Sequence, residues 1–349
     1  MRRAFYRKYK LKFKSPGGTS RGVLHEKETY IIALQDGERI GVGECALFRG
    51  LSYDDKPDYE SKLQETILKW TTEFEFTLDH LVHYPSLRFG VETALLDLQQ
   101  ENHILYPSAF TRGEEGIRIN GLIWMGEPDF MKKQIEDKLN SGFKCLKMKI
   151  GAIDFEKEIS LLQFIRQHFP ADRLELRVDA NGAFGEKDVL KKLDRLADFD
   201  IHSIEQPVKQ QQPKLMKKVI TESPIAVALD EELIGVHQQK DKHALLEELQ
   251  PHYIILKPAL VGGFSGSHEW IHAADEQNIG WWVTSALESN VGLSAIAQWT
   301  FTLNNSMPQG LGTGKLFHNN FESPLYLDGE LLKYNPATPW FDFKSLFDE

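Results

Sequence analysis

Residues 145–151 read CLKMKIG, a short apolar segment in which Lys147 and Lys149 stand two positions apart. Successive side chains of a β-strand point to opposite faces, so both ammonium groups would leave from the same face. A core strand normally carries branched apolar residues on both faces. A Lys-x-Lys pair by itself is typical of a solvated strand face, and only the rest of the chain can favour another interpretation.

Similar short apolar segments recur after residue 112 and alternate with longer amphipathic stretches of helical periodicity. The stretch at 127–142 has Pro128 near its start, apolar residues every three to four positions, and Gly142 at its end. Alternating strands and helices predict βαβ units and a parallel sheet, and eight units favour a closed (β/α) barrel. The expected strands are RINGLIWM (118–125), CLKMKIG (145–151), LELRVDAN (174–181), IHSIEQP (201–207), IAVALDEE (225–232), YIILKP (253–258), WWVTSALES (281–289) and QGLGTG (309–314).

The sequence predicts three regions. Residues 1–112 have the pattern of an α+β capping domain, which begins with a strand of alternating lysines and apolar residues. Residues 113–314 form the expected barrel with the active site. In residues 315–349 the alternation of strands and helices ends. This region contains an Asp-Gly hairpin signal in LYLDGELL and is expected to return to the capping domain.

A charged residue stands near the C-terminal end of five consecutive expected strands, at intervals of about one βα unit. Active sites of (β/α) barrels lie at this end of the strands, so the spacing gathers these groups around one barrel mouth. The order Lys, Asp, Glu, Asp, Lys is hard to explain as solvated surface. The residues are Lys147, Lys149, Asp179, Glu205, Asp230 and Lys257.

Three carboxylates on adjacent strands predict a site for a hard cation. Asp179, Glu205 and Asp230 are the expected ligands of Mg²⁺, with Mn²⁺ as the alternative. A lysine-bearing strand flanks this row on each side. A lysine that is partly desolvated beside another cation has a lowered pKa and can serve as a base.

The composition restricts the function classes. The chain of 349 residues has 51 acidic and 41 basic side chains and a formal net charge of −10, which argues against a general nucleic-acid or anionic-membrane binder. No apolar run reaches the length of a membrane span. Cys45 and Cys145 have no metal-ligand spacing and are expected to be buried free thiols in a cytoplasmic protein. The oligomeric state is open.

Several longer motifs resemble the enolase superfamily, in its muconate-lactonizing-enzyme-like subgroup, and within it the o-succinylbenzoate synthase family. Together they run from Gly41 to Gly314 and cover most of the chain. The matching segments are GVGECALFRGLS (41–52), LRFGVETALLDL (87–98), INGLIWM (119–125), LKMKIG (146–151), RVDANGAF (177–184), IEQP (204–207), LDEEL (229–233), ILKPALVGG (255–263) and SALESNVGL (285–293).

The resemblance implies a modified barrel of the TIM type, (β/α)7β, and a lyase that uses Mg²⁺. It implies that Lys149 abstracts the proton α to a carboxylate and then protonates the departing hydroxyl. It implies that Lys257 stabilises the enediolate as a cation and that Lys147 tunes Lys149. The assignment of acid and base between Lys149 and Lys257 stays open.

The implied reaction dehydrates 2-succinyl-6-hydroxy-2,4-cyclohexadiene-1-carboxylate to 2-succinylbenzoate in menaquinone biosynthesis. The second carboxylate of this small dicarboxylate substrate needs donors, for which the candidates are the backbone N–H groups near Gly262 and Gly263 and the hydroxyl of Ser285. The glycines are equally compatible with a tight βα turn. The cap loops KSPGGTSRG (14–22) and LFRGLS (47–52) are expected to cover the mouth.

Alternative functions share parts of this pattern. A dipeptide epimerase or N-acylamino acid racemase of the same superfamily would use the same two lysines, although the segment GLGTGKLF (310–317) has no acid for a substrate ammonium. HEWIH (268–272) matches the zinc-protease motif, but it falls on an outer helix of the expected barrel. A non-catalytic barrel would be expected to lack one of the lysines or carboxylates, and all are present.

Overall fold

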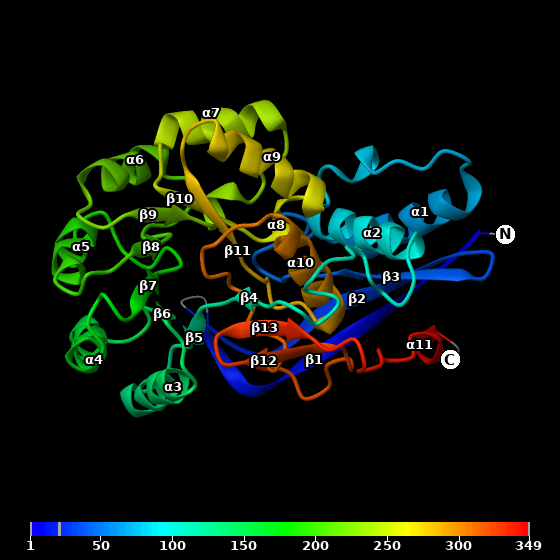
Figure 1. Cartoon of the computed structure of the whole chain (residues 1–349). Coiled ribbons are helices and arrows are strands. Elements are labelled where there is room, and N and C mark those ends of the chain that lie inside the picture. Colours follow the sequence, from blue (N-terminus) through cyan, green and yellow to red (C-terminus); the bar gives the residue numbers. More distant parts are fainter. Residues whose placement is uncertain (1, 20–21, 348–349) are drawn as a thin grey trace.

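The computed structural model describes residues 2–19 and 22–347. Figure 1 shows a barrel built from the middle of the chain and, beside it, a cap built from the N-terminal strands and helices. The last segment of the chain runs along both parts (Figure 1). Among the described helices, none is long and apolar enough to cross a membrane.

Seven parallel strands form one curved sheet in the order in which they follow each other along the chain. Helices connect successive strands on the outside of the sheet (Figure 1), so the predicted βαβ arrangement is confirmed. The strands are β5 (Gly121–Ile123), β6 (Cys145–Lys149), β7 (Glu175–Asp179), β8 (Ser203–Glu205), β9 (Val227–Leu229), β10 (Tyr253–Leu256) and β11 (Gly280–Val283). The helices are α3 (Pro128–Asn140), α4 (Phe155–His168), α5 (Val189–Ala197), α6 (Pro213–Glu222), α7 (Gln239–Leu249), α8 (Pro258–Val261), α9 (Gly263–Asp275) and α10 (Asn290–Thr302), with a 3₁₀ turn η2 (Glu231–Leu233) after β9.

Two residues take the place of the eighth strand. Gln309 forms a parallel bridge with Ile119, and Gly310 forms one with Thr284. The N–H of Gly310 donates to the carbonyl oxygen of Val283 at 2.8 Å. The barrel closes through these contacts, although the last expected strand is reduced to two residues.

The register of the sheet sets the functional residues at one level. Lys149 is paired with Asp179, Asp179 with Glu205, and Glu205 with Ala228. Lys149, Asp179 and Glu205 are the last residues of β6, β7 and β8. In-register strand ends therefore bring charges that are 26 to 30 residues apart in the sequence to one edge of the sheet.

The cap is an antiparallel sheet covered by helices. Its strands alternate as the sequence predicts, with Leu11 and Phe13 buried and Lys12 and Lys14 exposed. Ser20 and Arg21 of the predicted turn lie outside the described residues. The elements are β1 (Arg2–Thr19), β2 (Gly22–Asp36), β3 (Arg39–Cys45), α1 (Tyr59–Thr72), η1 (Asp79–Leu81) and α2 (Pro85–Leu98), in the sheet order β1-β2-β3.

The C-terminal segment joins a third, three-stranded sheet. Strands β12 (Leu325–Asp328) and β13 (Leu331–Tyr334) form the predicted hairpin, with Gly329 at φ +58° in the turn. Strand β4 (Ile117–Arg118) pairs with β13, so the first expected barrel strand is split between two sheets.

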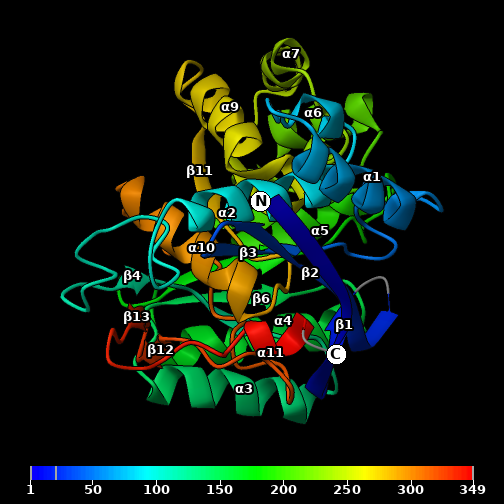
Figure 2. The ribbon, with the colours of Figure 1, turned by 90° about the vertical axis from the view of Figure 1, so that its right-hand side faces the viewer.

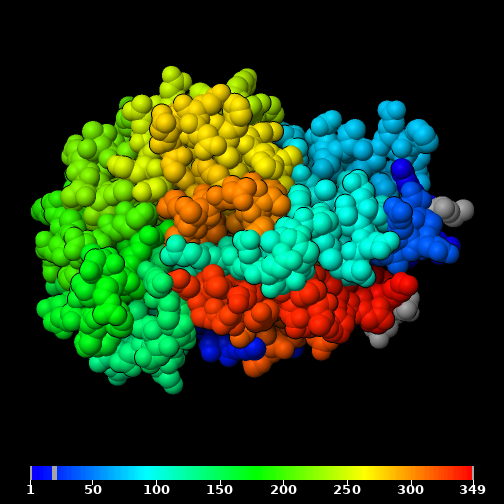
Figure 3. All heavy atoms as spheres, viewed as in Figure 1, coloured from blue at the N-terminus to red at the C-terminus, as the bar shows by residue number. Residues whose placement is uncertain are grey.

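The same segment also contacts the cap. Phe317 bridges to Phe13 of β1, and α11 (Lys344–Phe347) lies close to β1. Figure 2 shows α11 and the start of β1 on the same side of the molecule. In the space-filling view the C-terminal segment, coloured red, forms a band below the cyan cap residues (Figure 3).

Candidate active site

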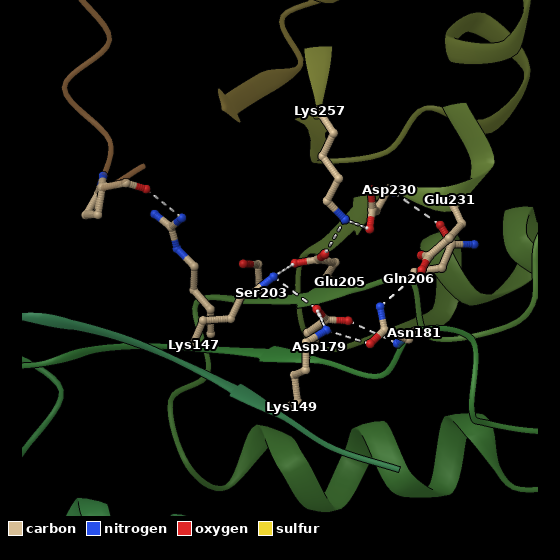
Figure 4. Close-up of polar contacts among 12 residues, drawn as sticks. Lys147, Lys149, Asp179, Asn181, Ser203, Glu205, Gln206, Asp230, Glu231 and Lys257 are labelled. Atoms are coloured by element: carbon tan, nitrogen blue, oxygen red, sulfur yellow. Dashed lines mark hydrogen bonds and ion pairs between the residues drawn. The ribbon is translucent and has the colours of Figure 1, made fainter. Parts of the chain in front are cut away.

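Strand β6 directs its two lysines into the barrel. Leu146 and Met148 are fully buried in the hydrophobic core. Because side chains alternate along a strand, Lys147 and Lys149 leave from the opposite face. Figure 4 shows both lysines pointing toward carboxylates of the neighbouring strands. All six predicted charged residues meet there, namely Lys147, Lys149, Asp179, Glu205, Asp230 and Lys257 (Figure 4).

Lys147 lies between two carboxylates. Its Nζ atom is 3.0 Å from Oδ2 of Asp179 and 2.5 Å from Oε2 of Glu205. The three side chains are 7%, 0% and 2% exposed to solvent, respectively. Removing one partner of such a buried group would leave an uncompensated charge in a medium of low dielectric constant. Lys147 therefore holds the ends of β7 and β8 together.

Lys257 occupies the corresponding place on the other side of Glu205. Its Nζ atom donates to Oδ2 of Asp230 and lies 3.8 Å from Oε1 of Glu205. Oε1 of Glu205 is buried and has no hydrogen-bond partner among the described residues. Glu205 thus lies between two lysines, with one oxygen not yet used in a hydrogen bond.

Lys149 contacts one carboxylate among the described residues. Its Nζ atom donates to Oδ2 of Asp179 at 2.9 Å and to Oδ1 of Asn181 at 2.7 Å. Asn181 in turn donates from Nδ2 to Oε1 of Glu231 at 3.0 Å. Sequence reasoning did not single out Asn181 or Glu231, although both stand within two residues of an expected ligand, in VDAN and LDEE.

The mutual contacts shift the pKa values of these groups. Burial favours a neutral amine at Lys147, but Asp179 and Glu205 outweigh it and raise the pKa of Lys147. Burial also opposes the charge on Lys257, and Asp230 outweighs it and raises the pKa of Lys257. Both ammonium groups lie against carboxylates, which accounts for these raised pKa values, and the lowering expected for a lysine beside a second cation stays a prediction. Burial favours neutral Asp179, yet Lys147 and the other ammonium groups lower the pKa of Asp179. Burial and the Asp179 carboxylate raise the pKa of Glu205 to about 7, and burial raises the pKa of Asp230.

The three carboxylates have the chemistry of a divalent-cation site. Asp179, Glu205 and Asp230 supply hard oxygen donors from adjacent strand ends, which suit Mg²⁺ or Mn²⁺. Within the described residues, no three metal-binding side chains converge on one point. The ammonium groups of Lys147 and Lys257 lie between the carboxylates instead. The donor set, with its unused Glu205 oxygen, fits such a cation, and the ligand roles stay predictions.

A pocket opens beside the lysines. Of the described residues that line it, three are lysines (Lys147, Lys149 and Lys257) and none carries a carboxylate. The cap loop at 47–52 contributes two of the apolar residues, as expected for a loop that covers the mouth. The pocket therefore suits an anionic ligand with an apolar body. Its apolar wall consists of Phe48, Leu51, Leu122, Trp124 and Leu287.

Ser285 lines this pocket, but its hydroxyl proton is directed elsewhere. Ser285 Oγ donates to Oε2 of Glu288 at 2.6 Å and accepts from Thr313 Oγ1 at 2.8 Å. A hydroxyl has only one proton to donate. Ser285 Oγ also accepts from the N–H of Leu287 at 3.0 Å, so while Glu288 accepts its proton this hydroxyl has no donor to offer a ligand.

The structure does not bring the other two expected substrate contacts to the pocket. Gly262 and Gly263 lie at the N-terminus of α9, outside the pocket lining. The next two backbone N–H groups, of Phe264 and Ser265, donate to the carboxylate of Glu92 from the cap helix α2. A Cβ atom at Gly263 would lie 2.0 Å from Oε2 of Glu92, so this glycine permits a close contact between cap and barrel.

The H-E-x-x-H segment does not form a metal site. His268 Nε2 accepts a hydrogen bond from Trp299 Nε1 at 3.0 Å, whereas His272 is exposed and lies 3.5 Å from Glu276. Both histidines belong to α9 on the outside of the barrel. The two histidines therefore do not point at one common site. This agrees with the prediction that the motif lies on an outer helix.

Two family models match the chain. Residues 131–333 match the Enolase C-terminal domain-like family, and residues 1–98 match the MenC N-terminal domain. An o-succinylbenzoate synthase from Desulfotalea psychrophila is 46% identical over 94% of this chain and 97% of its own length. One from Vibrio cholerae is 27% identical, with 93% of both chains covered.

Solved structures agree with this grouping. The crystal structure of MenC from Desulfotalea psychrophila has a TM-score of 0.85 at 42% identity and covers 95% of this chain and 99% of its own. The L-Ala-D/L-Glu epimerase from Bacillus subtilis has a TM-score of 0.81 at 20% identity, with 97% of both chains covered, and shows a shared fold alone. The chain therefore belongs to the enolase superfamily and, within it, to the o-succinylbenzoate synthase family of enzymes.

Proposed function

We propose that the protein catalyses the Mg²⁺-dependent dehydration of 2-succinyl-6-hydroxy-2,4-cyclohexadiene-1-carboxylate to 2-succinylbenzoate and water, a step of menaquinone biosynthesis. The observation that supports this substrate most directly is the pocket itself, in which three lysines and an apolar wall face the ligand without a carboxylate among the described lining residues. A dicarboxylate with a hydrocarbon ring matches both properties.

Lys149 is the proposed base. Of the three lysines it has the most exposed side chain, at 12%, and among the described carboxylates it contacts that of Asp179 alone. In its neutral form it takes the proton α to the substrate carboxylate, and the electrons of the C–H bond pass toward that carboxylate. Protonated Lys149 then delivers this proton to the leaving hydroxyl, so that the C–O bond breaks, water departs and the ring becomes aromatic.

Lys257 is the proposed electrostatic partner. Asp230 keeps it charged, and it lines the pocket together with Lys149. A fixed ammonium beside the substrate stabilises the negative charge that develops when the α proton leaves. The same two lysines could exchange acid and base roles. The geometry favours Lys149 as the base because Lys257 lies against Asp230 and 3.8 Å from Glu205.

A divalent cation completes the proposed site. Asp179, Glu205 and Asp230 would hold Mg²⁺, and the bound cation would supply positive charge to the substrate carboxylate. Lys147 would keep these ligands in place. The free, buried thiols of Cys45 and Cys145 agree with the proposed cytoplasmic location, which is a reducing compartment.

A direct assay tests the proposal. The purified protein is incubated with the cyclohexadiene substrate in Mg²⁺, in Mn²⁺ and after treatment with EDTA, and 2-succinylbenzoate is quantified by chromatography. We expect turnover with Mg²⁺, loss of turnover with EDTA, and recovery when Mg²⁺ is added back. Turnover that persists undiminished after complete metal removal would contradict the metal requirement.

An epimerase or racemase is the alternative function. It would use the same lysines, so the parallel assay offers a dipeptide and an N-acylamino acid and follows loss of optical rotation. The lack of a carboxylate among the described pocket residues argues against binding of a substrate ammonium group. Racemisation without any dehydration would replace the proposed function with this one.

A further inference from the structure

Two buried polar side chains in the wall of the reaction pocket lack a hydrogen-bond partner among the described residues. Asn120 precedes β5 and Thr284 follows β11, and both line the pocket. The Oδ1 atom of Asn120 and the Oγ1 atom of Thr284 are buried, and no described residue forms a hydrogen bond with either atom. Burial of a polar atom without a hydrogen bond is costly, so both side chains require a physical explanation.

The closing strands of the barrel place the two side chains in one row. Thr284 forms a bridge with Gly310, and Gln309 forms one with Ile119, so Asn120 stands opposite Gly310 on the next strand. The N–H of Asn120 donates to the carbonyl oxygen of Gln309 at 3.0 Å, which agrees with this register. Neighbouring strands lie about 4.8 Å apart, so the backbones of Asn120 and Thr284 are separated by about 10 Å. Asn120, Gly310 and Thr284 therefore form one row, here termed the polar row.

Gly310 leaves the middle of the polar row without a side chain, and it also lines the pocket. A Cβ atom at this position would lie 2.4 Å from Oγ1 of Thr284 and 2.8 Å from its Cγ2 atom. Any larger residue would therefore occupy the space beside the Thr284 hydroxyl. The glycine keeps this space available to a polar group of a ligand, between a hydroxyl on one side and an amide on the other.

The polar row can donate hydrogen bonds, unlike the neighbouring hydroxyl groups of the pocket. Thr313 Oγ1 donates to Ser285 Oγ, and Ser285 Oγ donates to Glu288, so both protons are committed. The proton of Thr284 has no acceptor among the described residues. The amide of Asn120 presents either its oxygen or its two N–H donors, depending on the rotation about χ2.

This arrangement suits the second carboxylate of the proposed substrate. The lysines and the proposed metal ligands account for the carboxylate next to which the proton is removed. The succinyl arm ends in another carboxylate, for which Ser285 has no proton to donate and the glycines of α9 lie outside the pocket lining. Hydrogen bonds from neutral donors to a carboxylate are charge-assisted and therefore strong.

We propose that the polar row binds the terminal carboxylate of the succinyl arm, with Thr284 and Asn120 as the specificity-determining residues that donate to it. This inference deepens the proposed dehydration and rests on it for the identity of the ligand. The polar row thus selects substrates that carry a second acidic group at the end of the arm.

The test compares two ligands that differ at this carboxylate alone. The product 2-succinylbenzoate and its analogue 2-butanoylbenzoate, which has a methyl group in place of the terminal carboxylate, are titrated calorimetrically into the purified protein with Mg²⁺. We expect the wild type to bind 2-succinylbenzoate on the order of 100-fold more tightly than the analogue. Thr284→Val and Asn120→Leu should each raise Kd for 2-succinylbenzoate on the order of tenfold, and should change Kd for the analogue by less than about threefold.

Thr300→Val is the matched control. Oγ1 of Thr300 is also buried without a hydrogen-bond partner among the described residues, but Thr300 belongs to α10 and is not among the described residues that line the pocket. This variant should leave both Kd values unchanged. Thr284→Ser keeps a hydroxyl group and should bind 2-succinylbenzoate within about threefold of the wild type. Thr284→Val should keep the wild-type Tm, because the hydroxyl that it removes forms no hydrogen bond with a described residue.

Two results would overturn the proposal. One is equal affinity of the wild type for the two ligands. The other is an unchanged Kd for 2-succinylbenzoate in Thr284→Val and Asn120→Leu, which would mean that the polar row binds water and not the ligand.

The titration needs no turnover, so it separates the subsite from the proposed function. If the wild type does not dehydrate the cyclohexadiene substrate but distinguishes the two ligands through the polar row, the proposed function fails and the subsite stands. If the wild type is active and its affinity for 2-succinylbenzoate does not depend on the polar row, the proposed function stands and the subsite is refuted.

Discussion

Lys149 differs from the other two site lysines in the number of carboxylates that it contacts. Lys147 lies against Asp179 and Glu205, and Lys257 lies against Asp230 and 3.8 Å from Glu205. Among the described residues, Lys149 contacts one carboxylate, that of Asp179, and donates its other hydrogen bond to the amide oxygen of Asn181. A lysine whose role is to lose and regain a proton needs fewer fixed negative charges around it. This difference supports Lys149 as the base.

Replacement of Lys149 by alanine should therefore abolish turnover and leave the fold intact. We expect kcat to fall by about 10³-fold or more, in the range that general bases contribute. Circular dichroism and thermal unfolding should show a native protein, because Asp179 keeps its bond to Lys147. A wild-type rate in Lys149→Ala would show that this residue takes no part in the mechanism.

Replacement of Lys147 by methionine should instead destabilise the protein. The variant leaves the buried carboxylates of Asp179 and Glu205 without the ammonium that lies between them. Breaking one partner of such a buried pair costs about 3–5 kcal/mol. Urea unfolding monitored by tryptophan fluorescence should show this loss in the absence of added metal. Equal midpoints for Lys147→Met and wild type would refute the structural role.

Strand β3 and helix α2 approach each other so closely that glycine is required at their contact. A Cβ atom at Gly43 would lie 2.0 Å from the carbonyl oxygen of Gly90, a backbone atom that cannot turn away. We expect Gly43→Ala to lower the free energy of unfolding by about 3 kcal/mol, as for severe overpacking.

Gly185→Ala is the control for this contact. The nearest atom to its Cβ would be Oδ1 of Asp188 at 3.4 Å, which is ordinary contact. Urea titration of both variants should show a large shift of the midpoint only for Gly43→Ala. Similar midpoints would mean that the helix moves away from the strand at little cost.

The order of the barrel elements could be predicted from the sequence because apolar strands and amphipathic helices alternate, and a charged residue recurs at the ends of five consecutive strands at a nearly constant interval. The in-register ends of β6, β7 and β8 then placed Lys149, Asp179 and Glu205 at one level. The closing strand was overestimated, because an apolar, glycine-rich run does not reveal that only Gln309 and Gly310 form bridges.

Side-chain contacts without a periodic signal were beyond the sequence. The direction of the Ser285 hydroxyl depends on Glu288, three residues later in the segment between β11 and α10. The close contact of Gly263 depends on Glu92, 171 residues earlier in the chain, and is set by how the cap sits on the barrel. The boundaries predicted at residues 112 and 314 stay predictions.

Charged and polar groups at helix ends join the cap to the barrel, alongside apolar contacts such as that of Phe89 with Phe264. Glu44 binds the N-terminus of α10, and Glu92 binds that of α9. Carboxylates are stabilised at such positions because the first N–H groups of a helix have no partner within it. The N-terminal cap thus supplies a carboxylate that binds the N-terminus of each of two barrel helices. These directional hydrogen bonds fix the position of the cap over the pocket.

A further contact between the two parts is made of aromatic rings. His237 lies in the segment between η2 and α7. Its ring centroid is 4.4 Å from that of Tyr53 and 4.9 Å from that of His83, two residues of the cap. A Cβ atom at Gly235 would lie 2.9 Å from the Tyr53 ring, so the barrel loop rests directly on the cap loop. Burial, followed by the charges of His83, Lys242 and Lys56, lowers the pKa of His237 to about 4.

Acid should therefore loosen the cap through His237. Its pKa in the folded protein lies below the unfolded value of about 6.5, so the unfolded chain binds the proton more tightly. The stabilisation is complete above about pH 6.5 and is lost as the pH falls toward 4. Because the ring is only half-buried, we expect a contribution on the order of 1 kcal/mol. Tm measured from pH 7.5 to 4.5 should fall less steeply in His237→Gln than in the wild type, and parallel slopes would show that this histidine does not carry the acid sensitivity.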